Sequence, residues 1–567
     1  MKAFVVAACA LAALLAALPA PAGATEPGPV LEAMTKEIQR SMKGLARSTP
    51  APYFISYRVT DIQRTDLHAA YGAIGANDTS HRRWLDVEVR VGDYQLDNTH
   101  RIKKEGGFFG FHIPQPVAVP IEDDPAALRD QLWLETDKQY KQAVEKFSEV
   151  ARDKTLRVEE RDQSADFSRE PPHRTIGKPA RLEVDTVAWA KRLRRYSRMF
   201  LDHPEITESR VGLSAKAQTK YFASSEGTVL RHGRIFVRLS LYAKTRAEDG
   251  MELMLHDSFD VRTPAALPKE REVRAAISRL CDNLQALRKA PVMEPYTGPA
   301  ILTGKAAGVF FHEIFGHRIE GHRQKDERDG QTFTRKVGEP ILPAIVSVID
   351  DPTLEAFEGQ DLRGHYRFDD EGVPARKVTV VDGGVLKNFL MSRTPVVEFD
   401  RSNGHGRAQH GYSPVARQGN LIIRGSDVVP DKRLRAMLIE ACKKQDKPFG
   451  LLFSEVSGGF TFTGRGIPQA FDVHPLLVYR VYADGRPDEL VRGVELIGTP
   501  LTSFSRIIAL GDENEVFNGT CGAESGGVPV SAIAPGVLTE QIEVQKKEKS
   551  ADRPPLLPPP PAKGATP

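Results

Sequence analysis

Cysteine is scarce in this sequence, with four cysteines among 567 residues. Cys9 lies in an N-terminal segment that we expect to be removed, which leaves Cys281, Cys442 and Cys521. Three cysteines are too few for a disulfide framework, so the sequence excludes the class of small, disulfide-stapled secreted domains. The odd count leaves at least one thiol that needs another role, either as a metal-bound thiolate or as a buried apolar side chain.

Long apolar runs are absent after the N-terminus, whereas a membrane-spanning helix needs about 20 apolar residues. We therefore expect no stable membrane span. Met1-Lys2, the apolar run Ala3–Leu18 and the small-residue end Ala22-Gly23-Ala24 predict a secretory signal peptide over residues 1–24. On this basis we expect an exported, soluble protein that is periplasmic or secreted.

An excess of charge of one sign is also missing, because 78 basic and 75 acidic residues give a formal net charge of +3. Such a small and evenly spread charge argues against nucleic acid or an anionic membrane as a partner. The sequence also lacks the G-x-S-x-G elbow, which argues against a serine hydrolase.

Chain length and patterning predict an α+β protein of two domains, because single cores stop growing at about 250–300 residues. We expect an N-terminal domain of sheet plus helices over residues 25–290 and a β-rich C-terminal domain over residues 297–545. The proline-containing run 290–299 marks the boundary between them. The tail, residues 546–567, is charged and then proline-rich, which is typical of extended, disordered segments.

Hydrophobic periodicity predicts the individual elements. The predicted helices are Val30–Leu45, Leu128–Val150, Asp185–Leu201, Glu270–Lys289 and Lys432–Lys444. The predicted strands are Tyr53–Thr60, Trp84–Asp93, Thr219–Ser224, Thr228–Tyr242, Met251–Val261, Ala300–Leu302, Arg376–Val381, Val385–Ser392, Phe471–Tyr482 and Glu489–Ile497.

The stretch 309–321 places His312, Glu313 and His317 in a short, mostly apolar run. Two imidazoles are common zinc ligands, and an adjacent Glu can act as a general base. The spacing is one residue longer than H-E-x-x-H, so a regular helix would set the two imidazoles about 140° apart. A π-bulge at Gly316 would bring them to one side. Either this is an unusual metal site or it is no metal site.

A catalytic zinc normally has three protein ligands, so a third must come from elsewhere. The glycine-rich stretch 518–530 offers Cys521 in a flexible-looking loop, whereas burial explains Cys281 and Cys442 in their helical surroundings. Glu320 is a candidate for orienting a ligand imidazole. If Glu320 or His322 instead supplied a fourth ligand, the site would be closed and structural.

The sequence resembles the TldD/PmbA metallopeptidases, also called modulators of DNA gyrase, whose catalytic members carry H-E-x-x-x-H. The likeness is close over residues 297–545 and loose over residues 30–290. Beside the His312 stretch it rests on F-D-D-E-G-V-P at 368–374, S-N-G-H-G-R at 402–407, E-L-I-G at 495–498, the Cys521 stretch and S-E-G at 225–227. Residues from about 99 to 178 depart from the family pattern as an insertion.

The resemblance implies that His312, His317 and Cys521 bind Zn²⁺ and that Glu313 is the catalytic base. It implies a zinc-dependent peptidase acting on short or unfolded peptides held in an internal cleft. It also implies a homodimer, or a heterodimer with a related subunit.

Two further questions stay open at the level of sequence. His405, Arg407 and His410 lie near a glycine-rich turn and are candidates for contacting substrate. The rival function is a non-catalytic protein that binds peptides or a partner subunit and holds a structural metal.

Overall fold

The computed structural model describes residues 26–102, 116–155, 162–325, 329, 331–461, 463–464, 471–498, 504–547, 555 and 557. The segment predicted to be a signal peptide lies outside the described residues. So do most of the predicted C-terminal tail and parts of the predicted insertion, namely residues 103–115 and 156–161.

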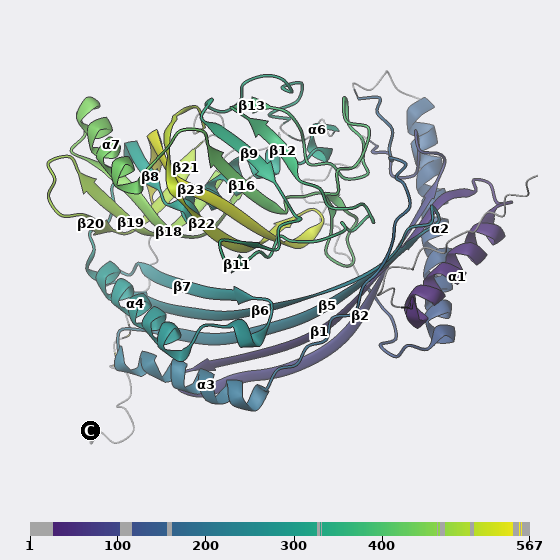
Figure 1. Ribbon diagram of the computed structural model, residues 1–567, viewed down its shortest axis with the longest axis horizontal. Coiled ribbons are helices and arrows are strands. Elements are labelled where there is room, and N and C mark those ends of the chain that lie inside the picture. Colours follow the sequence, from purple (N-terminus) through teal and green to yellow (C-terminus); the bar gives the residue numbers. More distant parts are fainter. Residues whose placement is uncertain are drawn as a thin grey trace, which may run out of the picture.

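A curved sheet dominates the first half of the chain, and the second half lies over its concave side (Figure 1). In the described residues this sheet has seven strands in the order β3-β2-β1-β5-β6-β4, with β7 paired to β6. Neighbours are antiparallel except β4 and β6. The strands are β1 (Pro52–Ala70), β2 (Ala73–Val91), β3 (Val117–Ala118), β4 (Arg174–Ile176), β5 (Glu208–Ser224), β6 (Val229–Arg246) and β7 (Glu252–Val261).

The hairpin of β1 and β2 is much longer than the two predicted strands, since each strand has 19 residues. The distal part of β2 is largely polar and exposed, and the middle of β1, residues 61–66, is mostly polar and half-buried, so hydrophobic alternation gives no signal in either segment. β1 pairs with β2 on one side and with β5 on the other. Backbone hydrogen bonds on both edges hold that part of β1 as a strand, whatever its side chains are.

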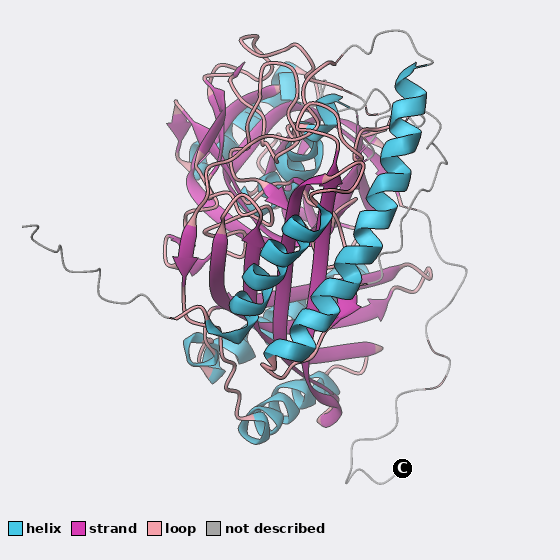
Figure 2. Ribbon diagram, turned by 90° about the vertical axis from the view of Figure 1, so that its right-hand side faces the viewer, coloured by secondary structure: helices cyan, strands magenta, loops and turns pink. Residues whose placement is uncertain are grey.

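Two pairs of helices pack on this sheet. α3 (Thr186–Arg198) and α4 (Glu270–Lys289) cover the convex face, where their apolar side chains share a core with β5, β6 and β7. α1 (Gly28–Leu45) and α2 (Pro125–Thr155) lie side by side at the other end of the sheet (Figure 2). The 3₁₀ turns η1 (Met199–Asp202) and η2 (Pro264–Ala266) complete this half.

A mixed sheet, twelve-stranded in the described residues, forms the second half. Its central path is β13-β12-β9-β16-β23-β21-β19-β18-β8, while β17, β20 and β22 pair beside it. The strands are β8 (Tyr296–Leu302), β9 (Val346–Asp350), β12 (Val378–Asp382), β13 (Val385–Leu386), β16 (Asn420–Gly425), β17 (Val428–Val429), β18 (Phe449–Thr461), β19 (Phe471–Tyr482), β20 (Glu489–Val491), β21 (Val494–Gly498), β22 (Ile507–Ala523) and β23 (Gly526–Lys546). Two short pairs, β10 (Ala356–Phe357) with β11 (Gln360–Asp361) and β14 (Gly406–Arg407) with β15 (Val415–Ala416), lie outside it.

The helix α5 (Gly304–Ile314) runs through the main core of this half, where Phe310, Phe311 and Ile314 are at most 2% exposed. α7 (Asp431–Lys444) lies on the outside against β8, β22 and β23. The predicted strand Val385–Ser392 is shorter than expected, because only Val385 and Leu386 pair with β12. The α+β fold class is confirmed.

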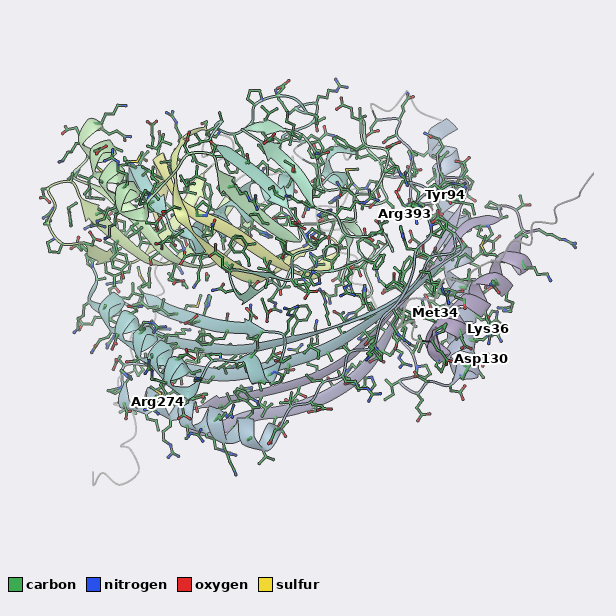
Figure 3. The ribbon with its side chains drawn as sticks, in the orientation of Figure 1. Met34, Lys36, Tyr94, Asp130, Arg274 and Arg393 are labelled. Carbon is green, nitrogen blue, oxygen red and sulfur yellow. The ribbon has the colours of Figure 1, made fainter. Side chains whose placement is uncertain are left out.

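Buried polar contacts connect the two halves near the end of β1 and β2. Arg393 and Tyr94, labelled in Figure 3, both donate to the Glu226 carboxylate at 2.8 Å. The Arg393 guanidinium also lies 3.8 Å from the centre of the Phe167 ring. These contacts fix the second half over the concave face of the first sheet.

Candidate metal centre

His312 and His317 lie on two different elements. His312 is in the last turn of α5, which ends at Ile314, and His317 is in the 3₁₀ turn η3 (Gly316–Arg318). The predicted π-bulge is therefore wrong. The α-helix stops and the chain tightens into a 3₁₀ turn, which carries His317 back towards His312. Their ring centroids are 5.2 Å apart.

Gly316 lets the side chain of Gln418 come close to the backbone at this point. It does not adopt a backbone conformation that requires glycine, since its φ is not positive. A Cβ added at Gly316 would lie 2.0 Å from Oε1 of the buried Gln418 side chain. The Nε2 of Gln418 donates to the His312 carbonyl at 3.4 Å. Gly316 therefore makes room for the side chain that holds the end of α5.

Cys521 lies on a strand, contrary to the predicted flexible loop. It is on β22, opposite Val528 of β23, and 5% exposed. The turn of this hairpin comes later, at Glu524 and Ser525, and β23 begins directly after it at Gly526, whose φ of 78° favours glycine. The strand pairing extends through the glycines of this stretch, which the sequence pattern suggested would form a loop. Cys281 and Cys442 are buried thiols in α4 and α7.

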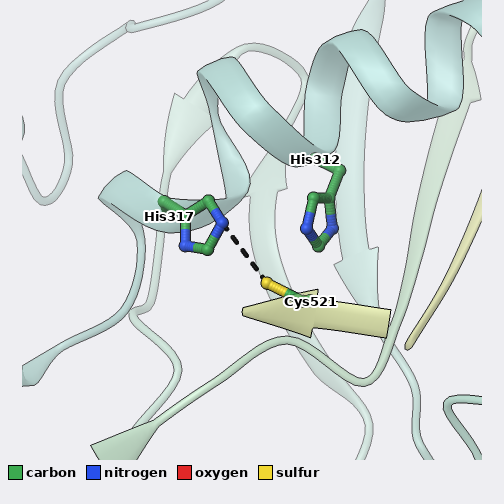
Figure 4. Close-up of side chains that lie close together, drawn as sticks. All are labelled: His312, His317 and Cys521. Atoms are coloured by element: carbon green, nitrogen blue, oxygen red, sulfur yellow. Dashed lines mark hydrogen bonds between the residues drawn. The ribbon is translucent and has the colours of Figure 1, made fainter. Parts of the chain in front are cut away.

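The two histidines and Cys521 come together in space (Figure 4). Their donor atoms lie within 4.8 Å of one another, and Cys521 Sγ is 3.3 Å from His317 Nε2. Bonds of about 2.0–2.3 Å in a tetrahedral zinc site place donors about 3.5 Å apart. The set of two imidazoles and one thiolate therefore fits a zinc ion with small side-chain adjustments. Among the described residues, no other donor belongs to this group.

The electrostatics of this cluster favour a thiolate beside cationic or metal-bound imidazoles. Burial raises the pKa of Cys521, but His317, His312 and Arg417 outweigh it and hold that pKa well below its usual range. Burial lowers the pKa of His312 and His317, yet the Cys521 thiolate outweighs it, so both pKa values are raised. A positive ion could replace the protons that this arrangement attracts.

Glu320 orients His317 from the side away from Cys521. It is fully buried, and its Oε2 lies 3.2 Å from His317 Nδ1 and 2.9 Å from Arg323 Nε. Arg417 Nε is 3.4 Å from Glu320 Oε1, within ion-pair distance although not aligned for a hydrogen bond. Burial raises the pKa of Glu320, but His317 and Arg323 lower it to about 2. A charged Glu320 leaves Nε2 as the ligand atom of His317.

Arg417 is a residue of this site that sequence reasoning missed. It donates to the Cys521 carbonyl at 2.7 Å and to Ser525 Oγ at 2.7 Å, so it holds the β22–β23 hairpin in place. His322, a candidate fourth ligand, instead bonds the Glu524 carboxylate. No local spacing connects positions 417 and 521, so only an alignment or a structure would have revealed this contact.

Glu313 and His312 open onto a cavity of about 780 Å³ between the two halves. One wall comes from β6 and β7, including Arg238, Tyr242 and His256. The other comes from α5, β18 and β22. Burial raises the pKa of Glu313, and its Oε2 is 3.9 Å from His317 Nε2. A carboxylate at this position can accept a proton from water held beside the three donors.

The three candidate substrate residues lie elsewhere. His405 is fully buried between Asn403 and Asp350, and Arg407 donates to the carbonyls of Gln418 and Pro529. His410 stacks on Trp84, with ring centroids 5.3 Å apart. They do not line the cavity in front of Glu313, so their positions suit a supporting role better than direct contact with substrate there.

Fold and site together define a two-layered protein with a candidate His/His/Cys metal centre beside an interdomain cavity, and comparisons identify its relatives. Residues 295–546 match the model of the PmbA/TldA metallopeptidase C-terminal domain. The metalloprotease MJ0996 of Methanocaldococcus jannaschii is 31% identical over 41% of this chain and 47% of its own length. The metalloprotease TldD homolog of Haemophilus influenzae is 24% identical over 78% of this chain and 88% of its own. Residues 295–546 of this chain are therefore a C-terminal domain of the PmbA/TldD metallopeptidase type.

Two other comparisons bear on cofactor and fold. The zinc metalloprotease TldD homolog of Saccharolobus solfataricus is 23% identical over 43% of this chain and 51% of its own length. The chain thus spans about half the length of this relative and of MJ0996. The crystal structure of TldE from Thermococcus kodakarensis superposes with a TM-score of 0.62 at 14% identity, covering 90% of this chain and all of that one. This likeness shows the shared fold.

The comparisons correct the predicted location in one respect. The relatives are named as metalloproteases and TldD homologues, and these matches do not support the predicted signal peptide or periplasmic location. Within the described residues, no helix is long and apolar enough to cross a membrane.

Proposed function

We propose that this protein is a zinc-dependent peptidase that hydrolyses short or unfolded peptides in the cavity between its two halves. The observation that carries the proposal is the position of Glu313. Its carboxylate lies beside three mutually close metal donors and opens onto a cavity of about 780 Å³. Such a volume accommodates several residues of an extended peptide. Relatives named as metalloproteases support the same activity.

The chain's own residues supply the proton transfers. Zinc, when bound, supplies a Lewis acid that activates water and polarises a carbonyl. Glu313 accepts a proton as the water oxygen bonds to the scissile carbonyl carbon, and then delivers it to the amine as the C–N bond breaks. Burial keeps the pKa of Glu313 above its usual value, which suits a group that must both take and return a proton.

The rival function, a non-catalytic protein with a closed structural metal, has less support. A closed site needs a fourth protein ligand. Glu320 faces Nδ1 of His317 and is engaged by Arg323, while His322 bonds Glu524. Among the described residues, only His312, His317 and Cys521 have donor atoms within 4.8 Å of one another, so neither Glu320 nor His322 belongs to this group.

We further propose that the protein works as a dimer, either of two copies or with a related subunit, as the resemblance to the family implies. Light scattering on the purified protein measures the mass directly. A mass of twice 62.6 kDa is expected for the homodimer. A monomer that pairs with no related subunit when both are co-expressed would contradict the proposal.

The peptidase proposal is tested by replacing Glu313→Gln and measuring zinc content and cleavage of an internally quenched peptide. We expect one zinc per chain in both proteins and a fall in kcat of about 100-fold or more in the variant. Glu455→Gln removes another carboxylate that lines the cavity and should have a much smaller effect. Equal activity in Glu313→Gln and in the unaltered protein would rule out the mechanism.

A further inference from the structure

The concave face of the first sheet carries a row of cations that leads away from the metal centre. Lys216 and Lys220 lie on β5, and Arg234 and Arg238 lie on β6. Lys216 is opposite Phe236, and Gln218 is opposite Arg234. Because side chains alternate along a strand, residues two apart share a face, so these positions all point to the same side. The opposite face carries the apolar core under α3 and α4.

Arg238 connects this row to the metal centre. Its guanidinium lines the cavity that contains Glu313 and donates to the Asn518 carbonyl at 2.8 Å. Asn518 is on β22, three residues before Cys521. Two hydrogen bonds, at 2.7 and 2.8 Å, also join Arg238 to Asp260. The row therefore begins at the wall of the proposed active site.

Next to Arg238, three cations surround one aromatic ring. Lys216 Nζ lies 5.7 Å, the Arg234 guanidinium 4.5 Å and the Arg363 guanidinium 5.6 Å from the centre of the Phe236 ring. Cation–π attraction offsets only part of the repulsion among three like charges. Burial, with added repulsion from neighbouring cations, lowers the pKa of Lys216 to about 7 and that of Arg234 to about 9.

Within the described ranges, two of these charges, those of Lys216 and Arg234, have no ion-pair partner. Asp260 pairs with Arg238 and Arg363, and Asp370 pairs with Lys220. The hydrogen bonds of Arg234 in the described part of the chain go to neutral acceptors, the His365 carbonyl at 3.0 Å and Gln218 Oε1 at 3.4 Å. Among the described residues, no carboxylate oxygen lies within ion-pair distance of Lys216 or Arg234. Unpaired charges in a half-buried position are costly and point to an anion from outside the chain.

A small cavity of about 70 Å³ adjoins Arg234. Lys220, His232, Arg234 and Arg407 line it. His232 Nδ1 is buried and has no hydrogen-bond partner among the described residues. The acids of this cavity are already engaged, because Asp369 accepts three backbone N–H groups and Asp370 binds Lys220. A cationic pocket with a spare polar atom suits a small anion.

We propose that Lys216, Arg234 and the adjoining cavity form a subsite for a carboxylate of the bound peptide, either an acidic side chain or the peptide's own C-terminus. The proposal rests on the proposed peptidase function. Arg234 and Arg238 are four residues apart on β6, which is about 13 Å along a strand. The carboxylate therefore binds about four extended residues away from the part of the peptide beside Glu313. This subsite makes the protein selective for acidic or short, C-terminally anchored peptides.

Binding is measured first without turnover, on the zinc-loaded Glu313→Gln protein, by fluorescence anisotropy of labelled Ala/Gly octapeptides. One set is neutral with an amidated C-terminus, one has a free C-terminus, and one carries a single Glu at successive positions on either side of the centre. We expect a free C-terminus or a Glu at one preferred position to tighten binding at least about tenfold, an effect that salt weakens. The free-acid and Glu sets distinguish the two sources of the carboxylate.

The tighter binding of the carboxylate-bearing peptides should disappear in the double variant Lys216→Gln/Arg234→Gln. It should persist in Arg234→Lys, which keeps the charge. Lys191→Gln, an exposed cation on the convex side in α3, is the matched control and should keep it. Equal affinity for neutral and acidic peptides, a gain that survives the double variant, or no peptide binding at all would overturn the subsite. If acidic peptides bind selectively but the unaltered protein cleaves none, the peptidase proposal fails and the subsite stands.

Discussion

The two ring nitrogens of His317 have different partners, and this difference prepares the residue to bind a metal. Nδ1 faces the buried Glu320 carboxylate at 3.2 Å, and Nε2 faces Cys521 Sγ at 3.3 Å. Carboxylates that bond a ligand imidazole typically raise metal affinity 10- to 100-fold. Arg323 and Arg417 hold Glu320 in turn, so the orientation of His317 depends on two buried cations.

We therefore predict that Glu320→Gln weakens zinc binding by about 10–100-fold. The amide keeps the shape but loses the charge, which also leaves Arg323 and Arg417 less well paired. A competition titration with a zinc chelator measures the affinity. Glu313→Gln is the informative comparison, because it should lose activity while keeping its zinc. Unchanged affinity in Glu320→Gln would show that the carboxylate has no orienting role.

A second prediction at this scale concerns Lys216, whose pKa burial lowers to about 7 from an ordinary value of 10.5. The protonated side chain costs folding free energy in full below pH 7, and this cost disappears as the pH rises towards 10.5. Lys216→Met should thus be more stable than the unaltered protein at pH 7 by about 1–3 kcal/mol, since one unit of pKa corresponds to about 1.4 kcal/mol. The difference should shrink by pH 9.5. Urea unfolding at both pH values measures it, and a constant difference would contradict the prediction.

At the scale of elements, the short connection from α5 to η3 decides whether His312 and His317 meet. Gly316 lies where a Cβ would collide with the side chain of Gln418, which in turn bonds the end of α5. We predict that Gly316→Ala costs about 1–3 kcal/mol of stability and lowers zinc affinity, because Gln418 must move. Gly316→Ala/Gln418→Ala should recover part of both. Gly44→Ala in α1, where a Cβ meets nothing within 4 Å, is the control for thermal unfolding and zinc titration.

Elements with one apolar face could be predicted from the sequence, and elements stabilised by their neighbours could not. Glu270–Lys289 is a helix with the predicted bounds, because its apolar residues repeat at helical spacing. The polar middle of β1 and the glycine-containing end of β22 are strands because adjacent strands pair with them. Likewise His312 and His317 stood out in the sequence, whereas the contacts of Arg417 depend on segments more than a hundred residues apart.

At the scale of the whole molecule, the candidate metal centre joins segments that are some two hundred residues apart. His312 and His317 belong to the start of the second half, and Cys521 belongs to its last hairpin. None of the three candidate donors comes from the first half, which supplies one wall of the cavity through β6 and β7. An ion bound here would therefore connect α5 to β22, on the side of the cavity opposite β6 and β7.

This arrangement predicts that removing the metal destabilises the folded chain as well as abolishing activity. A ligand present at 100 times its dissociation constant stabilises the folded state by about 2.7 kcal/mol. Treatment with a chelator should lower the midpoint of thermal unfolding by several degrees, and one equivalent of zinc should restore it. Cys521→Ser should start near the lower value and respond little. Cys442→Ser, in α7 and outside the candidate site, should keep the full response. If the zinc-loaded and zinc-free proteins unfold at the same temperature, the ion does not connect α5 to β22.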